Sequence, residues 1–304
     1  MTIDERAALG VDIGGTRVRA GVVTEDGRLL ARAETRLPID GEPAALRAIV
    51  GDLATDVLAR SGARPCAVGV ALPGVWDPAT TVMQRAVNLP RLEGTNLRDL
   101  FAQAVGRSVR LEADANAAIW GQYQALAPRP DRLLYLSLGT GIGGGVILDG
   151  QIVRHTRGGA GHFGFLIVDT TPGAPGGRND VPGCLSALAS GPALHLAATG
   201  RTDPAAIGEE PLPDHVLASA ADALAIGIFN LVHIYACRLT LLGGGVVDNH
   251  PRLVDEVRRA FARRSSKLMP EGFEIRRALL TTHEAGVMGA ALLALGEGAS
   301  DDPR

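Results

Sequence analysis

Two glycine-rich loops of similar design lie in the two halves of the chain, and their duplication strongly constrains the fold. The first loop spans residues 10–16 and the second spans residues 137–145. Each loop follows an apolar run and leads into another, which ends in an Asp-Gly turn at Asp26-Gly27 or Asp149-Gly150. Asp-Gly between apolar runs is a strong short-range hairpin signal. Two such hairpins in matching order predict a duplicated domain.

The glycines of these loops favour binding of an anion. Glycine has no Cβ, so backbone N–H groups beside it approach a phosphate closely. Two loops of this kind facing each other would hold one polyphosphate between two lobes, which indicates a nucleotide-binding protein. The predicted phosphate-binding residues are Gly14, Gly15, Thr16 and Arg17 in the first loop and Gly139, Thr140 and Gly141 in the second.

Length and charge narrow the classes of function. The 304 residues suffice for two domains, and the formal net charge of −3 gives no electrostatic footprint for nucleic acid. The apolar stretch Ala223–Leu242 contains Asn230, His233 and Arg238, which predicts a buried helix and strand rather than a membrane span. Three widely spaced cysteines suit a reducing compartment. We expect a cytoplasmic protein that binds neither nucleic acid nor membranes.

Periodicity predicts the same element order in both halves. Residues 9–34 and 133–153 each indicate three short strands, which are followed by helices and strands. This order predicts an α/β fold with mixed sheets and helices on their faces. The expected helices are Ala44–Arg60, Leu97–Val105, Cys184–Ala198, Asp214–Ala236, Pro251–Arg264 and Glu284–Leu295, and the expected later strands are Ala67–Leu72, Val109–Glu112, Leu239–Leu242 and Phe273–Leu280.

Two aspartates are candidates for chemistry. Asp114 begins a helical pattern at the end of a strand, so it is either a helix N-cap, a general base for a hydroxyl that attacks a phosphoryl group, or both. Asp12 lies just before the first glycine turn. It either caps a hairpin or serves as a partner for Mg²⁺ beside bound phosphate.

Two further glycine-rich segments complete the candidate site. Gly243, Gly244 and Gly245 follow a buried strand, where bare backbone admits a ribose or flat ring. His162 lies within the run Gly158–Gly164, and a lone histidine is more often structural than functional.

These motifs together resemble the ROK family of sugar kinases and repressors, a branch of the actin-like/hexokinase-like ATPases. The resemblance extends over nearly the whole chain. It is carried by Asp12-Ile13-Gly14-Gly15-Thr16, Pro73-Gly74, Asn88-Leu89-Pro90, Asp114-Ala115-Asn116-Ala117-Ala118, Gly139-Thr140-Gly141-Ile142-Gly143, Gly183-Cys184-Leu185, Ala189-Ser190-Gly191, Asn230-Leu231-Val232, Gly243-Gly244-Gly245-Val246 and residues 285–291.

The resemblance implies two RNase-H-like lobes around a central cleft. The N-terminal lobe would span residues 1–114 and be completed by a C-terminal helix at about 290–304, and the C-terminal lobe would span 115–289. It also implies ATP and Mg²⁺ as cofactors, Asp114 as general base and Gly243–Gly245 near the adenosine. The residues expected to bind substrate are Asn88, Ala113, Asp114, His162 and Ser186.

Departures from the family pattern are informative. Ala113 replaces the usual asparagine before the base, Ser186 replaces a glutamate, and His162 and Phe165 replace the glutamate and histidine of Gly-Glu-x-Gly-His. The family's zinc segment keeps only Cys184, with Gly177 and Asn179 at cysteine positions, so we expect no zinc. His162 donates hydrogen bonds where a carboxylate only accepts them. These departures indicate either drift in a family member with another sugar-binding geometry or, as we expect, an acceptor other than plain glucose.

Three hypotheses follow. The leading one is an ATP-dependent kinase that phosphorylates a hydroxyl of a sugar or sugar-like polyol, with a homodimer compatible with its apolar helices. The second is a non-catalytic sugar/ATP sensor related to ROK repressors but without a DNA-binding domain, since only eight residues precede Leu9. The third is a polyphosphate donor bound by Arg17, Arg154 and Arg157.

Overall fold

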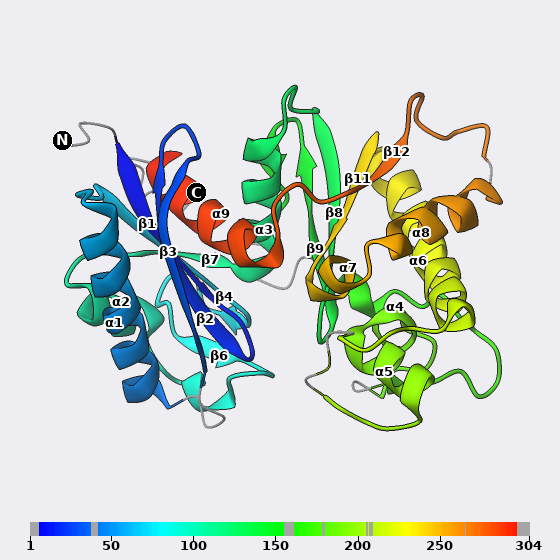
Figure 1. Cartoon of the computed structure of the whole chain (residues 1–304), viewed down its shortest axis with the longest axis horizontal. Coiled ribbons are helices and arrows are strands. Elements are labelled where there is room, and N and C mark those ends of the chain that lie inside the picture. The colour runs from blue at the N-terminus through cyan, green and yellow to red at the C-terminus, as the bar shows by residue number, and fades with distance from the viewer. Residues whose placement is uncertain are drawn as a thin grey trace. The chain divides into compact units, whose positions relative to one another are not determined.

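The computed structural model describes residues 6–37, 42–154, 161–177, 180–204, 206, 209–264 and 266–296. Packing divides the chain into two compact units (Figure 1). Unit 1 consists of Met1–Leu126, Arg154–Ala160 and His283–Arg304, and unit 2 consists of Ala127–Val153 and Gly161–Thr282. Asn179 and Arg157, which entered the sequence predictions, lie outside the described residues.

Unit 1 is built on a five-stranded mixed sheet. Its first three strands are antiparallel neighbours, and the last two run parallel to the first. All seven residues of the first strand are buried, as expected for a strand covered on both faces. In spatial order the strands are β3 (Leu29–Arg36), β2 (Arg17–Thr24), β1 (Ala7–Ile13), β4 (Ala67–Leu72) and β7 (Arg110–Ala113).

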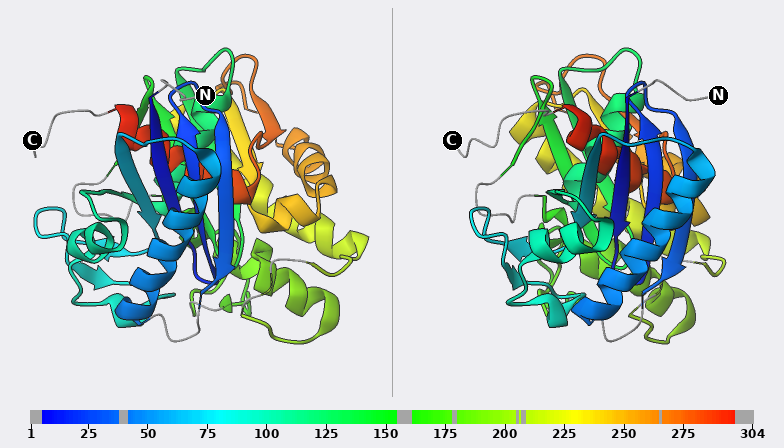
Figure 2. Two further views of the ribbon diagram at one scale, coloured as in Figure 1. Left: turned by 60° about the vertical axis from the view of Figure 1, so that its left-hand side comes forward. Right: turned by 90° about the vertical axis from the view of Figure 1, so that its left-hand side faces the viewer.

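Helices cover both faces of this sheet (Figure 2). Helix α1 (Pro43–Ser61) packs against β2, β3 and α2 (Leu97–Val105). It starts with a proline and ends at Gly62, whose left-handed φ of 63° suits a helix stop. A 3₁₀ turn, η1 (Pro90–Leu92), and the short pair β5 (Val75–Trp76) and β6 (Met83–Arg85) complete this side of the unit.

Helix α9 (Thr282–Gly296) lies against the opposite face of the sheet at very close range. A Cβ placed on Gly10 of β1 would lie 2.0 Å from the carbonyl oxygen of Val287, so only glycine permits this approach. Helix α3 (Asp114–Ala125) packs against α9 in the same way, because a Cβ on Gly289 would lie 1.7 Å from the carbonyl oxygen of Ala117.

The compact units therefore differ from the lobe boundaries expected from the sequence. The expected boundary at 114/115 separates α3 from the sheet of unit 1. The expected start of the C-terminal helix of that lobe, at about residue 290, falls within α9. Packing instead keeps both helices with unit 1, which ends its first segment at Leu126 and resumes at His283. The physical reason is the close α3–α9 contact at Gly289, together with that of α9 on β1.

Unit 2 repeats the sheet topology of unit 1. Its first three strands are again antiparallel, and the last two again run parallel to the first. This repetition confirms the duplicated α/β domain that the two hairpins predicted, and it agrees with the two RNase-H-like lobes that the family resemblance implied. In spatial order the strands are β10 (Gln151–Ile152), β9 (Ile142–Leu148), β8 (Arg132–Leu138), β11 (Leu239–Gly243) and β12 (Glu274–Arg277).

The long helix α6 (Asp214–Tyr235) supplies much of the core of unit 2. It is the one described helix that is long and apolar enough to cross a membrane by length and composition. It packs against α8 (Arg252–Ala262) and α4 (Leu185–Ala189), which confirms the interpretation as a buried helix. The remaining elements of the unit are η2 (Phe163–Phe165), α5 (Gly191–Thr199) and α7 (Gly245–Asn249).

One predicted helix of unit 2 was wrong. The helix expected over Cys184–Ala198 is broken into α4 and α5 at Ser190, whose backbone is extended with ψ of 162°. Pro192 follows in the first turn of α5. A proline lacks the N–H needed within a helix but fits its first turn, so the chain restarts rather than continues there.

Candidate active site

The carboxylate of Asp12, at the end of β1, is held in one position inside unit 1. It is 7 % exposed, and Arg19 Nη1 of the neighbouring strand donates to its Oδ2 at 3.1 Å. Gly286 of α9 leaves room for it, since a Cβ there would lie 2.5 Å from the Asp12 Cγ. Burial raises the pKa of Asp12, and the charge and hydrogen bond of Arg19 offset part of that rise.

Asp114 lies at the start of α3, where β7 ends. It is the first residue of the helix, and the N-cap position belongs to Ala113, so the N-cap interpretation was displaced by one residue. Its Oδ1 accepts a hydrogen bond from the Ala115 N–H at 2.7 Å. Burial and then the nearby charge of Asp12 raise the pKa of Asp114 to about 6, against the lowering effect of backbone hydrogen bonds from Ala115 and Asp114 itself.

The first glycine loop presents its tip to solvent. The Gly14 N–H donates to the Arg17 carbonyl oxygen at 2.8 Å and closes the turn, which leaves Gly15 and Thr16 exposed. Asn88 lies over this turn, since a Cβ on Gly15 would come within 3.2 Å of the Asn88 Cβ. The structure therefore brings Asn88 to the predicted phosphate loop.

An ion-pair network that the sequence did not predict lies beside Asp114. Glu112 is 8 % exposed, and its Oε2 accepts a hydrogen bond from Arg154 Nε at 2.9 Å. Its Oε1 accepts from Asn116 Nδ2 at 2.9 Å and from the Ala113 N–H at 3.1 Å. This network fixes the β7–α3 junction that carries Asp114. The sequence offered one signal for this network, which is the carboxylate of Glu112 within a predicted strand, two residues before Asp114.

The second glycine loop, in unit 2, has a geometry that the protein's own packing does not require. The Gly139 N–H donates to the Gly141 carbonyl oxygen at 2.9 Å, and Gly141 is exposed. A Cβ on Gly141 would meet no atom within 4 Å. Thr140 lies between the two glycines. Packing among the described residues does not require glycine at this open position, and the phosphate-binding role of the loop stays a prediction.

The third glycine segment connects β11 to α7. Gly244 has φ of 93°, and a Cβ there would lie 2.2 Å from the carbonyl oxygen of Leu138, the last residue of β8. Gly243 is closed in by Tyr135 and Ala278, and Gly245 begins α7. Internal packing already explains glycine at 243 and 244, so their predicted place near the adenosine stays a prediction.

The predicted substrate-binding residues of unit 2 are His162 and Ser186, and Phe165 is the second residue that departs from the family's Gly-Glu-x-Gly-His motif. His162 and Phe165 are both exposed, and their rings meet edge to face with centroids 6.3 Å apart. The Ser186 hydroxyl instead accepts a hydrogen bond from the Ile142 N–H at 3.0 Å, and a Cβ on Gly164 would lie 2.1 Å from it. Ser186 thus fixes the start of β9, and its contact with substrate stays a prediction.

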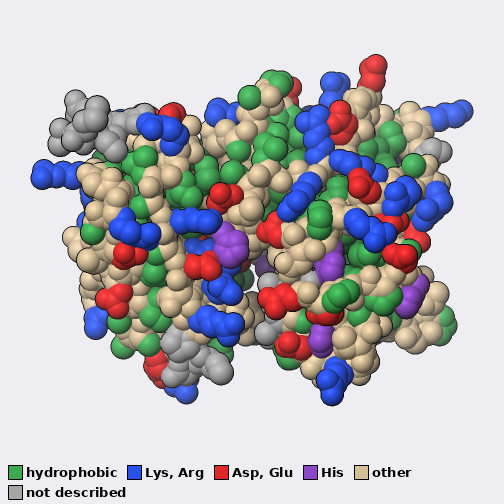
Figure 3. Space-filling model, viewed as in Figure 1, with side chains coloured by type: hydrophobic (Ala, Val, Ile, Leu, Met, Phe, Trp, Pro, Cys, Tyr) green, Lys and Arg blue, Asp and Glu red, His purple; other side chains and the backbone are tan. Residues whose placement is uncertain are grey.

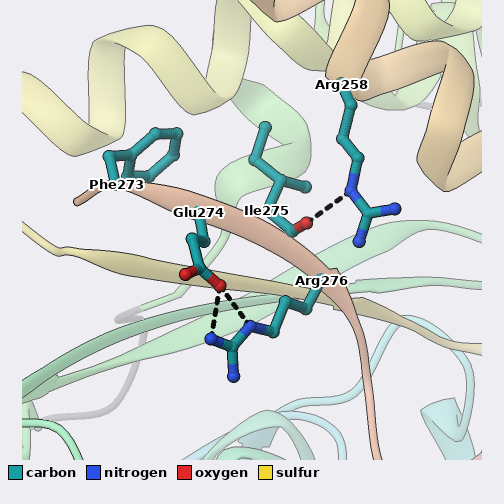
Figure 4. A pocket seen from close by; sticks show the side chains of 5 residues that line it. All are labelled: Arg258, Phe273, Glu274, Ile275 and Arg276. Carbon is teal, nitrogen blue, oxygen red and sulfur yellow. Dashed lines mark hydrogen bonds and ion pairs between the residues drawn. The ribbon is translucent and has the colours of Figure 1, made fainter.

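Charged side chains and a surface pocket also lie outside the candidate site. On the face drawn in Figure 3, acidic and basic side chains are interleaved. A pocket of about 410 Å³ lies beside β12 in unit 2 (Figure 4). There Arg258 Nε donates to the Ile275 carbonyl oxygen at 2.7 Å and Arg276 pairs with Glu274, so these charged groups already have partners. Within the described ranges, no three His, Cys, Asp or Glu side chains form a metal-binding group.

Comparisons with known proteins establish the family of the chain. The sequence pattern that defines the ROK family matches residues 8–297. The chain belongs to the ROK family. An N-acetylmannosamine kinase from Salmonella typhi is 30 % identical over 302 residues, which cover 95 % of this chain and 98 % of that protein.

Solved structures resemble this ROK protein over nearly its whole length. A ROK hexokinase from Thermus thermophilus is 33 % identical with a TM-score of 0.76, covering 96 % of this chain and 98 % of that one. A ROK glucokinase from Streptomyces griseus, solved with glucose and AMPPNP, is 29 % identical with a TM-score of 0.75, covering 95 % and 99 %. The ROK protein described here is a carbohydrate kinase, and the alternative of a non-catalytic sensor is not favoured.

Proposed function

We propose that this kinase transfers the γ-phosphoryl group of ATP to a hydroxyl of an N-acylated hexosamine, of which N-acetylmannosamine is the first to test. The observation that carries the choice of acceptor is the exposed pair of His162 and Phe165, which stands where the family usually has a glutamate and a histidine. The relatives named N-acetylmannosamine kinase support the same class of acceptor.

Asp114 is proposed as the general base. Its Oδ1 is held by the Ala115 N–H, and among the described residues no other side chain donates a hydrogen bond to the carboxylate, which leaves its second oxygen, Oδ2, for the substrate. That second oxygen would accept the proton of the attacking hydroxyl. With a pKa of about 6, the carboxylate is mostly ionised at neutral pH yet more basic than an ordinary aspartate. Both properties suit proton abstraction.

The glycine loops are proposed to bind the nucleotide in each unit. In unit 1, the exposed N–H groups of Gly15 and Thr16 would contact phosphate, and Asp12 would hold Mg²⁺, which neutralises charge on the phosphate oxygens when bound. In unit 2, Gly139, Thr140 and Gly141 would contact phosphate, and Gly243–Gly245 would lie near the adenosine. The buried, singly paired carboxylate of Asp12 is a donor type that suits Mg²⁺.

The acceptor would be recognised by complementary groups on His162 and Phe165. A ring N–H of His162 would donate to the carbonyl oxygen of the acyl group, a bond that a glutamate at this position is unable to make. The acyl methyl would pack against the Phe165 ring, which is 49 % exposed. Plain glucose has neither group and would leave both contacts unmade. In unit 1, Asn88 would contact a sugar hydroxyl, whereas Ala113 lacks the side chain to do so.

ATP is favoured over polyphosphate as donor. Two of the arginines considered for polyphosphate are paired with carboxylates, Arg17 with Glu34 at 2.7 Å and Arg154 with Glu112 at 2.9 Å. We also propose a cytoplasmic protein that forms a homodimer and binds neither nucleic acid nor zinc. Light scattering of the purified protein tests the oligomeric state, and elemental analysis tests the absence of zinc.

An acceptor panel tests the proposed function. Direct ADP quantification with Mg-ATP compares N-acetylmannosamine, N-acetylglucosamine, mannosamine, mannose and glucose, with Asp114→Asn as the blank. We expect kcat/KM at least 100-fold higher for an N-acetyl hexosamine than for its free amino sugar or for glucose. Equal or greater efficiency with glucose would refute the proposed acceptor while leaving the kinase assignment intact.

Substitution of His162 tests the recognition step directly. His162→Glu restores the carboxylate usual in the family, and we expect it to raise the ratio of glucose to N-acetyl hexosamine efficiency at least tenfold. The exposed His215 on α6 offers a matched control, and His215→Glu should leave the ratio unchanged. An unchanged ratio in His162→Glu would remove His162 from acceptor recognition.

A further inference from the structure

Three charged side chains form a row across neighbouring strands of unit 1. The strand register pairs Asp12 of β1 with Arg19 of β2, and Arg19 with Glu34 of β3. Directly paired residues in an antiparallel sheet point to the same face, so the three side chains lie side by side. The row joins a candidate Mg²⁺ ligand to the edge strand of the sheet.

Arg19 is the central and most constrained member of the row. Its side chain is 12 % exposed, and its Nη1 donates to Asp12 Oδ2 at 3.1 Å. Its Nε lies 3.5 Å from Glu34 Oε2, which makes an ion pair but no hydrogen bond, and this buried Nε has no hydrogen-bond partner in the described part of the chain. An arginine buried between two carboxylates has little freedom to move, and it limits the freedom of both.

Glu34 is in turn anchored from two directions. Arg17 Nη1 donates to its Oε1 at 2.7 Å, and His283 Nδ1 of α9 lies 2.7 Å from its Oε2. Burial opposes ionisation of Glu34, but the hydrogen bond and charge of His283 and the charges of Arg17 and Arg19 outweigh it and hold its pKa below the usual value. Glu34 is therefore a fixed anion that holds the outer side of Arg19.

We infer that Arg19 is a positioning residue for the phosphate site, which fixes the Asp12 carboxylate in the orientation needed to bind Mg²⁺ with the nucleotide. Gly286 leaves room for both oxygens of the Asp12 carboxylate, and Arg19 occupies Oδ2. Oδ1 has no hydrogen bond from another side chain among the described residues, so it is the oxygen that would face the ion. The inference rests on the proposed role of Asp12. Arg19 would act on the site through Asp12, without contacting nucleotide or acceptor itself.

The geometry makes this role separable from simple stabilisation. Loss of Arg19 would leave a buried carboxylate beside Asp114 without its cation, and that carboxylate would turn toward other partners. Binding of nucleotide with Mg²⁺ should weaken, whereas binding of nucleotide without Mg²⁺ and of acceptor should not. A purely structural residue would affect all three alike.

The test compares nucleotide affinity with and without the metal. Isothermal titration of a non-hydrolysable ATP analogue into Arg19→Met should show at least tenfold weaker binding with Mg²⁺ and less than twofold change in EDTA. Glu34→Gln removes the negative charge that holds Arg19 on the side away from Asp12, so nucleotide affinity with Mg²⁺ should weaken about threefold. Arg32→Met is the matched control, because Arg32 lines the same surface pocket without contacting Asp12, and it should match wild type.

Chemical rescue adds a second measurement that does not depend on the choice of side chain. A pocket of about 360 Å³, lined in part by Arg19, Arg32, Glu34 and His283, opens beside this position and would admit a guanidinium ion. In Arg19→Ala, millimolar guanidinium chloride should restore Mg-dependent binding at least threefold over equal NaCl. Loss of affinity equally in EDTA, absence of loss, or failure of rescue would each overturn the inference. Retained activity in Asp114→Asn would instead count against the proposed function.

Discussion

The raised pKa of Asp114 makes a quantitative prediction about the pH dependence of catalysis. A general base acts only when ionised, so kcat/KM should fall as the pH drops through the pKa of about 6. The ordinary value for an aspartate is 3.8, and the difference arises from burial and from the charge of Asp12. At pH 5 only about one carboxylate in eleven would be ionised, so kcat/KM should be about tenfold below its plateau.

The assay must separate catalysis from the behaviour of coupling enzymes and from unfolding. ADP is measured directly by chromatography after acid quench, between pH 4.5 and 8 at constant ionic strength, since salt screens charge interactions. Circular dichroism at each pH confirms that the chain remains folded. An inflection near pH 6 supports the reasoning. A plateau that extends below pH 5, with its inflection near 4, would refute the proposal that Asp114 is a desolvated base.

Three further predictions concern stability. Asp114→Asn removes a partly buried charge, so chemical denaturation at pH 7 should show a free energy of unfolding about 1–2 kcal/mol higher than that of the wild type. Because the pKa of Asp114 is higher in the folded state than in the unfolded state, this gain should shrink toward pH 4. A lower free energy of unfolding at pH 7 would contradict the prediction. Gly10→Ala would push β1 away from the Val287 carbonyl group, so it should lower the free energy of unfolding by about 3 kcal/mol or prevent folding. Gly296→Ala is the control, because a Cβ there meets no other atom of the described residues within 4 Å, and it should change the free energy of unfolding by less than about 0.5 kcal/mol. Asn96→Ala removes the side chain that accepts from the Asp99 N–H at 3.0 Å to cap α2, so a denaturant melt should show a loss of about 1 kcal/mol, and no loss would be the contrary result.

Much of the fold was predictable because it depends on local signals. The Asp-Gly hairpins and apolar runs fix three antiparallel strands in each half, and the predicted strand Ala67–Leu72 and helix Leu97–Val105 have the observed bounds. These elements combine a regular hydrophobic period with clear stop signals at their ends. The duplicated topology then follows from the repeated order of elements.

The broken helix of unit 2 and the grouping of α3 with unit 1 have physical causes that lie outside local sequence. The break between α4 and α5 occurs within a continuous apolar pattern, where Ser190 adopts an extended conformation before Pro192. The assignment of α3 to unit 1 depends on its close contact with α9, which is formed by residues far apart in the chain. Hydrophobic periodicity carries no information about either feature.

The candidate site was predictable in its residues more than in its connections. Asp12, Asp114 and the glycine loops stand out in the sequence because their motifs are local. Arg19 became significant only when the strand register placed it between Asp12 and Glu34. This register is set by pairing between strands that a single sequence does not reveal. The sequence hinted at the role of Arg19 only by placing a charged residue within an apolar strand.

The central claim is that Asp114 supplies the base for phosphoryl transfer. The most direct test measures acceptor-dependent ADP release and nucleotide affinity together in Asp114→Asn. Loss of a general base should lower kcat by about 10²–10⁴-fold, while calorimetric binding of Mg-nucleotide stays within threefold of wild type. Turnover within tenfold of wild type, at unchanged nucleotide affinity, would contradict the account.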